Sequence, residues 1–338
     1  MNKVFSLSVV IVGFLLASAI GVAQSPSNVA QPDSQRRIPD FLIGVPGKDK
    51  QRALRELTEQ SDQWAELRRR CGNLLVADHS LDREFRDDAE LTALLGKIRA
   101  MNLPLQLEVG AVKQWGKTGQ ECFDRQQPKW ERFLRCGGVI DSIAMDEPLV
   151  CTQVHLKMGD DAMEHALEET VKFVGLVRRA YPHWMVGDIE GFPGLPLDDL
   201  IRWIDQLEAR LKADHGRGLD FFRLDVDWMH FVHNTGKGRW SDIKRVENHC
   251  RSKNIPFSIV YWASNYPAML KKELADDVTW YVGAIQMGFN YAAVGGTPDQ
   301  IVVQSWVAGP PTILPETAPF SFTRSALDIV NRFRPEKK

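Results

Sequence analysis

The chain has 338 residues and a formal net charge of −2, so its charge balance excludes strong electrostatic attraction to nucleic acid or to an anionic membrane surface. Hydrophobic residues make up 44% and charged residues 25% of the chain, a composition typical of a globular protein and not of a disordered one. We therefore expect a folded protein with no nucleic-acid partner.

The N-terminus has the parts of a secretory signal peptide. Lys3 gives a positively charged start, residues 4–22 are apolar, and Gly21-Val22-Ala23 offers small residues for cleavage. We expect residues 1–23 to be a signal peptide and residues 24–38 to be a flexible, Pro- and Ser-containing leader. The mature protein is then secreted or periplasmic, with no membrane attachment after cleavage, because no later apolar run is long enough to span a bilayer.

Five cysteines in an exported chain allow two disulfides and one remaining thiol. Cys122 and Cys151 fall in loops after neighbouring predicted strands, so they are the first candidates for a pair. Cys71, Cys136 and Cys250 lie at predicted helix ends and are interpreted as buried thiols.

From residue 39 onward, short β-rich apolar runs alternate with amphipathic helical stretches. The expected strands cover residues 41–46, 73–78, 103–111, 141–148, 184–190, 220–228, 255–262 and 301–307. The expected helices cover residues 50–70, 87–101, 128–135, 160–180, 197–212, 239–253, 267–291 and 322–333. Such strict alternation predicts an α/β fold, a single (β/α)8 TIM barrel over residues 39–335. The competing open, doubly wound sheet usually has a Gly-rich phosphate motif after its first strand, where Pro46-Gly47-Lys48 stands instead.

Side chains of a barrel strand point alternately to the interior and to the helices. In the sixth strand this alternation separates Arg223, Asp225 and Asp227 from an apolar set of the opposite parity. Over all strands, the polar and aromatic residues expected to face inward are Gln106, Glu108, Asp188, Glu190, Arg223, Asp225, Asp227, Gln304 and Trp306. Burying unpaired carboxylates is costly, so these acids are expected at the open mouth, where barrel active sites lie. An interior salt-bridge network, with Arg223 neutralising Asp225 or Glu108, is the alternative.

The fourth predicted strand ends in Met145-Asp146-Glu147-Pro148. This ending resembles the Asn-Glu-Pro ending of strand four in clan A glycoside hydrolases. The resemblance implies that Glu147 is the general acid/base and that Asp146 contacts a sugar hydroxyl. On the eighth strand, Trp306 preceded by Ser305 also resembles the tryptophan on which the sugar stacks in that clan.

The seventh strand departs from the clan's pattern, because it ends in Tyr261-Trp262-Ala263-Ser264 and has no carboxylate where the clan has its nucleophile. Glycosidic cleavage generally needs two carboxylates. The candidates for the second one are Glu190, Asp225, Asp227 and Glu108, with Glu190 and Asp227 preferred because each comes last in its strand's inward set. Our hypothesis is that Glu147, with a raised pKa, protonates the leaving oxygen while the second carboxylate activates water or attacks the anomeric carbon.

Aromatic and polar side chains near the strand ends favour a carbohydrate ligand, because sugar rings stack on aromatic planes while their hydroxyls bond to acids and amides. The expected substrate-binding residues are Asp146, Glu108, Asp188, Arg223, Trp262, Tyr261, Trp306, Gln304 and Trp115. No cofactor is expected, and the oligomeric state and the identity of the sugar stay open.

Two alternatives to a hydrolase stay open on the same barrel. A divalent-metal sugar isomerase or lyase would use Glu147, Glu190 and Asp225 as oxygen ligands. A carbohydrate-binding barrel without catalytic activity would account for the missing nucleophile.

Overall fold

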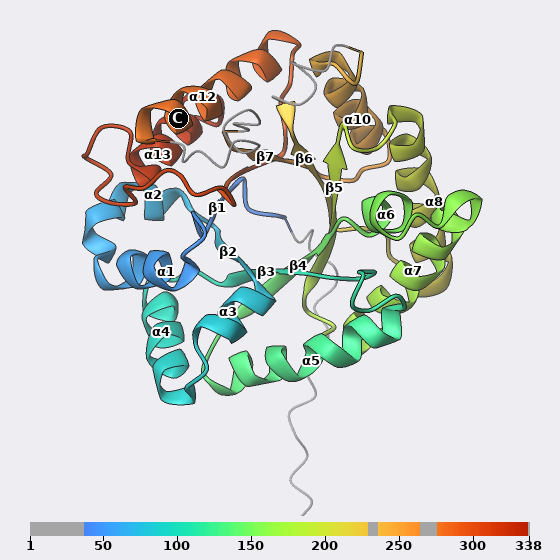
Figure 1. Cartoon of the computed structure of the whole chain (residues 1–338), viewed down its shortest axis with the longest axis horizontal. Coiled ribbons are helices and arrows are strands. Elements are labelled where there is room, and N and C mark those ends of the chain that lie inside the picture. Colours follow the sequence, from blue (N-terminus) through green and yellow to red (C-terminus); the bar gives the residue numbers. More distant parts are fainter. Residues whose placement is uncertain (1–36, 229–235, 264–275, 337–338) are drawn as a thin grey trace, which may run out of the picture. The chain divides into compact units, whose positions relative to one another are not determined.

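The structure is a computed structural model that describes residues 37–228, 236–263 and 276–336. Residues Ile38–Lys338 fall in one compact unit. Its eight strands are parallel and form a closed barrel in the order β1 to β8, with the helices around the outside (Figure 1). The predicted (β/α)8 TIM barrel is therefore confirmed. The predicted signal peptide and almost all of the predicted leader lie outside the described residues.

The strands lie close to their predicted positions. They are β1 Phe41–Gly44, β2 Asn73–Ala77, β3 Leu105–Val109, β4 Ile140–Asp146, β5 Met185–Phe192, β6 Phe221–Val226, β7 Phe257–Tyr261 and β8 Gln300–Val303. Strands β1 and β8 close the barrel in register, with Phe41 opposite Ile301 and Ile43 opposite Val303. A closed sheet has no free edge, and its strands' carboxyl ends meet at one mouth.

The helices alternate with these strands in the chain. They are α1 Lys50–Glu59, α2 Ala65–Arg70, α3 Asp78–Glu84, α4 Asp88–Ala100, α5 Gly119–Arg135, α6 Pro148–Val150, α7 Ala162–Ala180, α8 Leu197–His215, α10 Trp240–Ser252, α12 Asp277–Ala293 and α13 Phe322–Phe333. Part of the helix expected over residues 267–291 lies outside the described residues. No helix in the described part of the chain is long and apolar enough to cross a membrane.

Local capping explains where the structure departs from the predicted helices. Helix α5 begins at Gly119, well before the predicted start at Pro128, because Thr118 and Glu121 form a capping box there. The helix expected over residues 50–70 is split at Gln60, where the backbone leaves the helical region and α1 ends. A short helix, α3, forms directly after β2 where a strand end was expected.

The barrel interior is layered along β6. Phe221 lies in an apolar cluster with Ile38, Ala144, Met185 and Ile189. Two residues further toward the carboxyl end, Arg223 donates to neutral side chains of three other strands, with partners Gln106, Ser258 and Gln300 at 2.6, 3.1 and 2.7 Å. Asp225 follows and lies at the mouth, so the polarity of the interior rises toward the carboxyl ends of the strands.

All five cysteines are free thiols. The expected pair Cys122–Cys151 is therefore not formed. The sulfur of Cys122, in the first turn of α5, lies 3.0 Å from the carbonyl oxygen of Gly116 and donates to it. Burial raises the pKa of both thiols, which keeps them protonated.

Candidate active site

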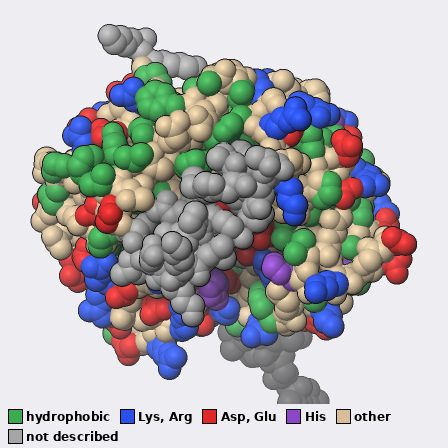
Figure 2. Space-filling model, turned by 45° about the horizontal axis from the view of Figure 1, so that its top comes forward, with side chains coloured by type: hydrophobic (Ala, Val, Ile, Leu, Met, Phe, Trp, Pro, Cys, Tyr) green, Lys and Arg blue, Asp and Glu red, His purple; other side chains and the backbone are tan. Residues whose placement is uncertain are grey.

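A cavity of about 210 Å³ lies at the carboxyl ends of the strands. Its lining residues come from six strands or their ends and are Glu108, Asp146, Glu147, Ile189, Asp225, Val260, Gln304 and Trp306. Acidic side chains are visible near the middle of the face that Figure 2 presents. The structure thus brings together four acids that the sequence predicts to belong to one site.

Glu147 occupies an unusual backbone position at the end of β4. Its φ and ψ are 51° and 54°, in the left-handed region, directly before Pro148 at the start of α6. A non-glycine residue in this region costs about 1–3 kcal/mol and persists only where surrounding structure enforces it. Its amide donates to the carbonyl oxygen of Ile189 at 2.9 Å, which ties the turn to β5. This geometry turns the Glu147 carboxyl into the cavity beside the neighbouring strand.

The pKa values of two lining carboxyls are raised to about 7. For Glu147 the main cause is burial, followed by the charge of Asp146, while Lys113 opposes the shift. For Glu108 burial again comes first and Asp146 second, and here Gln304, Lys113 and Lys50 oppose. A carboxyl with a pKa near neutrality can both give and take a proton at physiological pH, as a general acid must.

Asp225 has an even stronger tendency to keep its proton. Burial, and then the charges of Glu147 and Glu108, raise the pKa of this carboxyl well above its usual range. Its buried Oδ1 atom has no hydrogen-bond partner in the described part of the chain. A buried acceptor without a donor is rare in native proteins, and Asp225 is the residue with such an oxygen among those that line this cavity.

Two lysines of the mouth are functional candidates that the sequence analysis misses. Lys113, in the loop after β3, forms an ion pair with Asp146, and the pKa of Lys113 is raised because this pairing outweighs burial. Lys50 begins α1 and donates to the carbonyl oxygens of Val45 and Ser305. Burial lowers the pKa of Lys50 to about 8, against the attraction of Glu108. Neither lysine lies in a motif, so only the fold reveals its place.

The predicted inward orientation of Asp188 and Glu190 on β5 is wrong. Ile189, between them, lines the cavity, so the two acids face the helices. Asp188 accepts from the indole nitrogen of Trp203 at 2.7 Å, and Glu190 accepts from the amides of Leu149 and Val150 at 2.7 and 3.2 Å. These donors hold the two acids on the outer face, although Oδ1 of Asp188 has no hydrogen-bond partner among the described residues. Alternation of side chains along the strand does not predict this placement. Glu190 therefore supports α6, directly after Glu147, rather than reaching the cavity.

Of the aromatic residues predicted to bind substrate, some lie at the cavity in the structure and others do not. Trp306 lines the cavity, and the centroid of its ring lies 4.0 Å from the ring centroid of Trp262. Trp262 is itself buried, and its indole nitrogen donates to the carbonyl oxygen of Val226. Tyr261 is wrongly predicted to bind substrate, because its side chain is buried against Phe333 of α13. Trp115 is 43% exposed, lies under the guanidinium of Arg125 and does not line the cavity.

Arg223 and Asp227 flank the cavity without lining it. The partners of Arg223 are neutral amides and a hydroxyl, so the alternative in which it neutralises Asp225 or Glu108 by direct pairing is not realised among the described residues. Burial lowers the pKa of Arg223 to about 9, although Glu108 opposes this shift. The amide of Asp227 donates to the carbonyl oxygen of Phe192 at 2.8 Å, and the Asp227 charge contributes to the raised pKa of Asp225.

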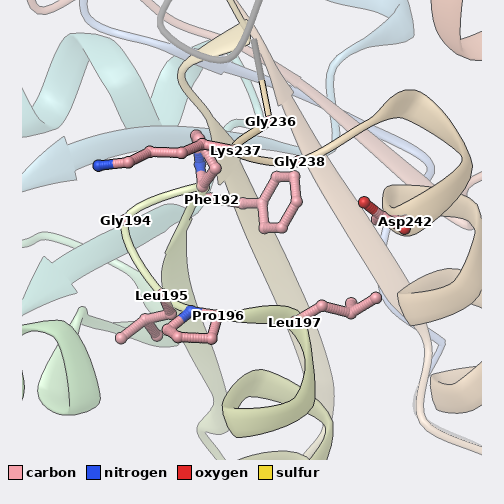
Figure 3. A pocket seen from close by; sticks show the side chains of 10 residues that line it. Phe192, Gly194, Leu195, Pro196, Leu197, Gly236, Lys237, Gly238 and Asp242 are labelled. Carbon is pink, nitrogen blue, oxygen red and sulfur yellow. The ribbon is translucent and has the colours of Figure 1, made fainter. Parts of the chain in front are cut away.

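A second cavity, of about 350 Å³, lies between the loop after β5 and the segment before α10. Figure 3 shows the loop Phe192–Leu197 facing the segment with Gly236, Lys237 and Gly238, with Asp242 beyond it. Its charged side chains are Lys237 and Asp242 alone among its lining residues, and no cluster of carboxyls gathers there. The chemistry of an acid and a second carboxylate therefore belongs to the smaller, acidic cavity.

Within residues 37–228, 236–263 and 276–336, no group of three or more His, Cys, Asp and Glu side chains is arranged to hold a metal ion. The metal-dependent alternative relies on Glu147, Glu190 and Asp225 as ligands. Because Glu190 faces α6, these three carboxylates do not converge.

No protein-family model matches the chain, and no curated protein matches it. Solved structures do match. GH5_18 from Streptomyces cattleya, in complex with GlcNAc, aligns with a TM-score of 0.52 and 14% identity over 89% of this chain and 82% of that one. A fungal β-1,4-galactanase aligns with a TM-score of 0.49 and 10% identity over 78% and 88% of the two chains. D-psicose 3-epimerase from Clostridium cellulolyticum H10, with D-tagatose, aligns with a TM-score of 0.48 and 10% identity over 88% of this chain and 100% of that one. The similarity to GH5_18, at 14% identity, shows a shared fold and does not establish a shared activity.

Proposed function

We propose that this protein is a glycoside hydrolase-like enzyme that cleaves glycosidic bonds of an oligosaccharide or polysaccharide outside the cytoplasm. The observation that carries the proposal is Glu147, a carboxyl with a pKa of about 7 that lines a cavity together with three further acids. Its position at the end of β4, in Asp146-Glu147-Pro148, supports the same role through the resemblance to clan A glycosidases.

In this proposal Glu147 is the general acid that protonates the leaving oxygen. Glu108 is the second carboxylate in this proposal. Burial and Asp146 raise its pKa to about 7, as they do for Glu147, but Lys50 and the amide of Gln304 favour the ionised form of Glu108 in addition to Lys113. The Gln304 amide nitrogen lies 3.5 Å from Oε2 of Glu108. The largest influences on Asp225 are burial and neighbouring acids, which favour its protonated form, so in this proposal Asp225 binds substrate instead of reacting. The anomeric configuration of the first product then distinguishes attack by Glu108 from activation of water.

Other lining residues suit the binding of a sugar ring. Trp306 offers an aromatic face, supported from behind by Trp262, on which the apolar side of a pyranose can stack. Asp146, fixed by Lys113, and Gln304 offer acceptors and a donor to the hydroxyls. This combination of one aromatic face and several fixed polar groups is typical of ligand sites.

The proposal is tested by the release of reducing ends from a broad panel of polysaccharides by the purified mature protein. Glu147→Gln should abolish the turnover that the wild type shows, whereas Glu66→Gln, a change of the same charge on the exposed side of α2, should not. Wild-type protein without turnover on any glycan, or full activity of Glu147→Gln, would contradict the proposal.

A further inference from the structure

The charged groups that line the acidic cavity are all carboxyls: Glu108, Asp146, Glu147 and Asp225. The cations nearby are already engaged. Lys113 is paired with Asp146, Lys50 donates to two backbone carbonyls, and Arg223 donates to neutral side chains below. Three of the four lining acids thus have no ion-pair partner within the described residues. Burial and mutual repulsion therefore raise the pKa values of these three carboxyls, so each ionises less readily than a free carboxyl.

A second and independent observation concerns a single atom. Asp225 lines the cavity, and its buried Oδ1 atom has no hydrogen-bond partner in the described part of the chain. Leaving a buried acceptor unpaired costs about 1–3 kcal/mol, more for a charged group, so an occupant that donates a hydrogen bond here recovers that energy. A donor on a ligand would therefore satisfy Asp225, and a positive charge on the same group would stabilise the ionised forms of the surrounding acids.

We propose that the cavity takes a sugar with a free, protonated amino group, whose ammonium donates to Asp225. An ammonium satisfies both requirements, because it donates up to three hydrogen bonds and compensates the charge of the neighbouring carboxylates. A neutral sugar hydroxyl supplies a donor without the charge. A uronate would bring a further negative charge among four acids, so the same site excludes it.

This inference deepens the proposed function by naming its substrate class, and it rests on the carbohydrate-binding part of that function but not on turnover. In this arrangement the apolar face of the sugar stacks on Trp306, and Glu147 lies beside the glycosidic bond to be broken. Binding and catalysis are therefore tested separately.

The experiment is isothermal calorimetry at near-neutral pH, where the lining carboxyls can ionise and a sugar amine is still partly protonated, with Glu147→Gln protein so that no ligand is consumed. The probes are glucosamine tetramer, its fully N-acetylated counterpart and a galacturonate tetramer. We expect glucosamine tetramer to bind about tenfold tighter than the acetylated tetramer, as expected for a charge-assisted hydrogen bond. The galacturonate tetramer should give no measurable heat.

Asp225→Asn added to this protein should remove most of the preference for the free amine. Asp62→Asn, which removes the same charge from the exposed side of the short helix Ser61–Trp64, should leave it unchanged. Thermal melting shows whether Asp225→Asn is folded. If it is not, Asp146→Asn provides the second variant, since it frees the Lys113 ammonium and should also weaken binding of the cationic sugar.

Equal affinity for the free and acetylated tetramers would overturn the inference. Displacement of the amino sugar by low concentrations of Ca²⁺ or Mg²⁺ would also overturn it, because the site would then be assigned to a metal cation. Hydrolysis of neutral glycans with no amine preference would remove this inference and leave the proposed function standing. Tight, Asp225-dependent binding of the amino sugar without turnover by the wild type would support this inference and contradict the proposed hydrolase function.

Discussion

The carboxyl of Glu147 lies against the α-carbon of Gly191 on the neighbouring strand. A Cβ atom at Gly191 would be 2.5 Å from Oε1 of Glu147, well inside van der Waals contact. Gly191 points toward the barrel because its neighbour Glu190 faces the helices. The absence of a side chain at Gly191 thus provides the space that Glu147 occupies.

Gly191→Ala should lower activity about a hundredfold, because displacement of a catalytic group by about 1 Å is enough for such a loss. Thermal stability should change little, since the contacted atom is the end of a flexible side chain that can move away. The measurement is kcat/KM together with the melting temperature. Gly194→Ala is the matched control, because its nearest neighbour would be 3.8 Å away, and it should retain activity. Equal activity of the two variants would contradict the placement of Glu147.

The pH dependence of the rate follows from the raised pKa of Glu147. A general acid works in its protonated form, so kcat/KM should fall as pH rises through about 7. The charge of Glu108 contributes to this raised pKa, so Glu108→Gln should move the alkaline limb of the residual activity to lower pH. A pH–rate profile of both proteins checks this. An alkaline limb that stays in place would show that Glu108 does not act on the acid.

The same carboxyls should make stability depend on pH. The pKa values of Glu108 and Glu147 rise from 4.5 to about 7 on folding, so the folded state binds the protons more tightly. Their stabilising contribution is complete below the unfolded value and is lost as pH rises from about 4.5 to about 7, at up to about 1.4 kcal/mol per pH unit for each group. Urea unfolding of the wild type across this window should show the decline. In Glu147→Gln the free energy of unfolding should fall less steeply with pH. An unchanged slope would contradict the raised pKa of Glu147.

Glu190 is expected to act as a positioning residue. Its two carboxylate oxygens accept from the amides of Leu149 and Val150, immediately after Glu147 and Pro148. Glu190→Gln brings an amide N–H₂ group toward one of these donors and should cost about 1–3 kcal/mol.

Asp188→Asn is the matched control for Glu190→Gln, because Asp188 is a buried acid of the same strand that bonds Trp203 of α8 instead of the β4 loop. Both variants should lose stability, but kcat should fall markedly in Glu190→Gln alone. Denaturant unfolding and steady-state kinetics separate the two effects. Equal losses of kcat would show that Glu190 has a structural role only.

The sequence predicts the barrel well because periodicity and the strict alternation of strands and helices depend on local patterns. It also predicts the acids of β3, β4 and β6, since each lies at a strand end with apolar neighbours of opposite parity. It fails at β5, because Val186, Asp188 and Glu190 share one parity and the orientation is decided by partners distant in the sequence, Trp203 and the amides of α6. Lys113 and Lys50 are missed for the same reason: only the closed barrel brings their loops to the mouth.

The most direct test of Glu147 as the general acid compares two aryl glycosides of the same sugar, one with a poor and one with a good leaving group. A good leaving group departs without protonation, so it needs no acid. Glu147→Gln should therefore lose about 10²–10⁴-fold in kcat/KM on the poor leaving group and little on the good one. Equal losses on both substrates, or no loss on either, would contradict the role assigned to Glu147.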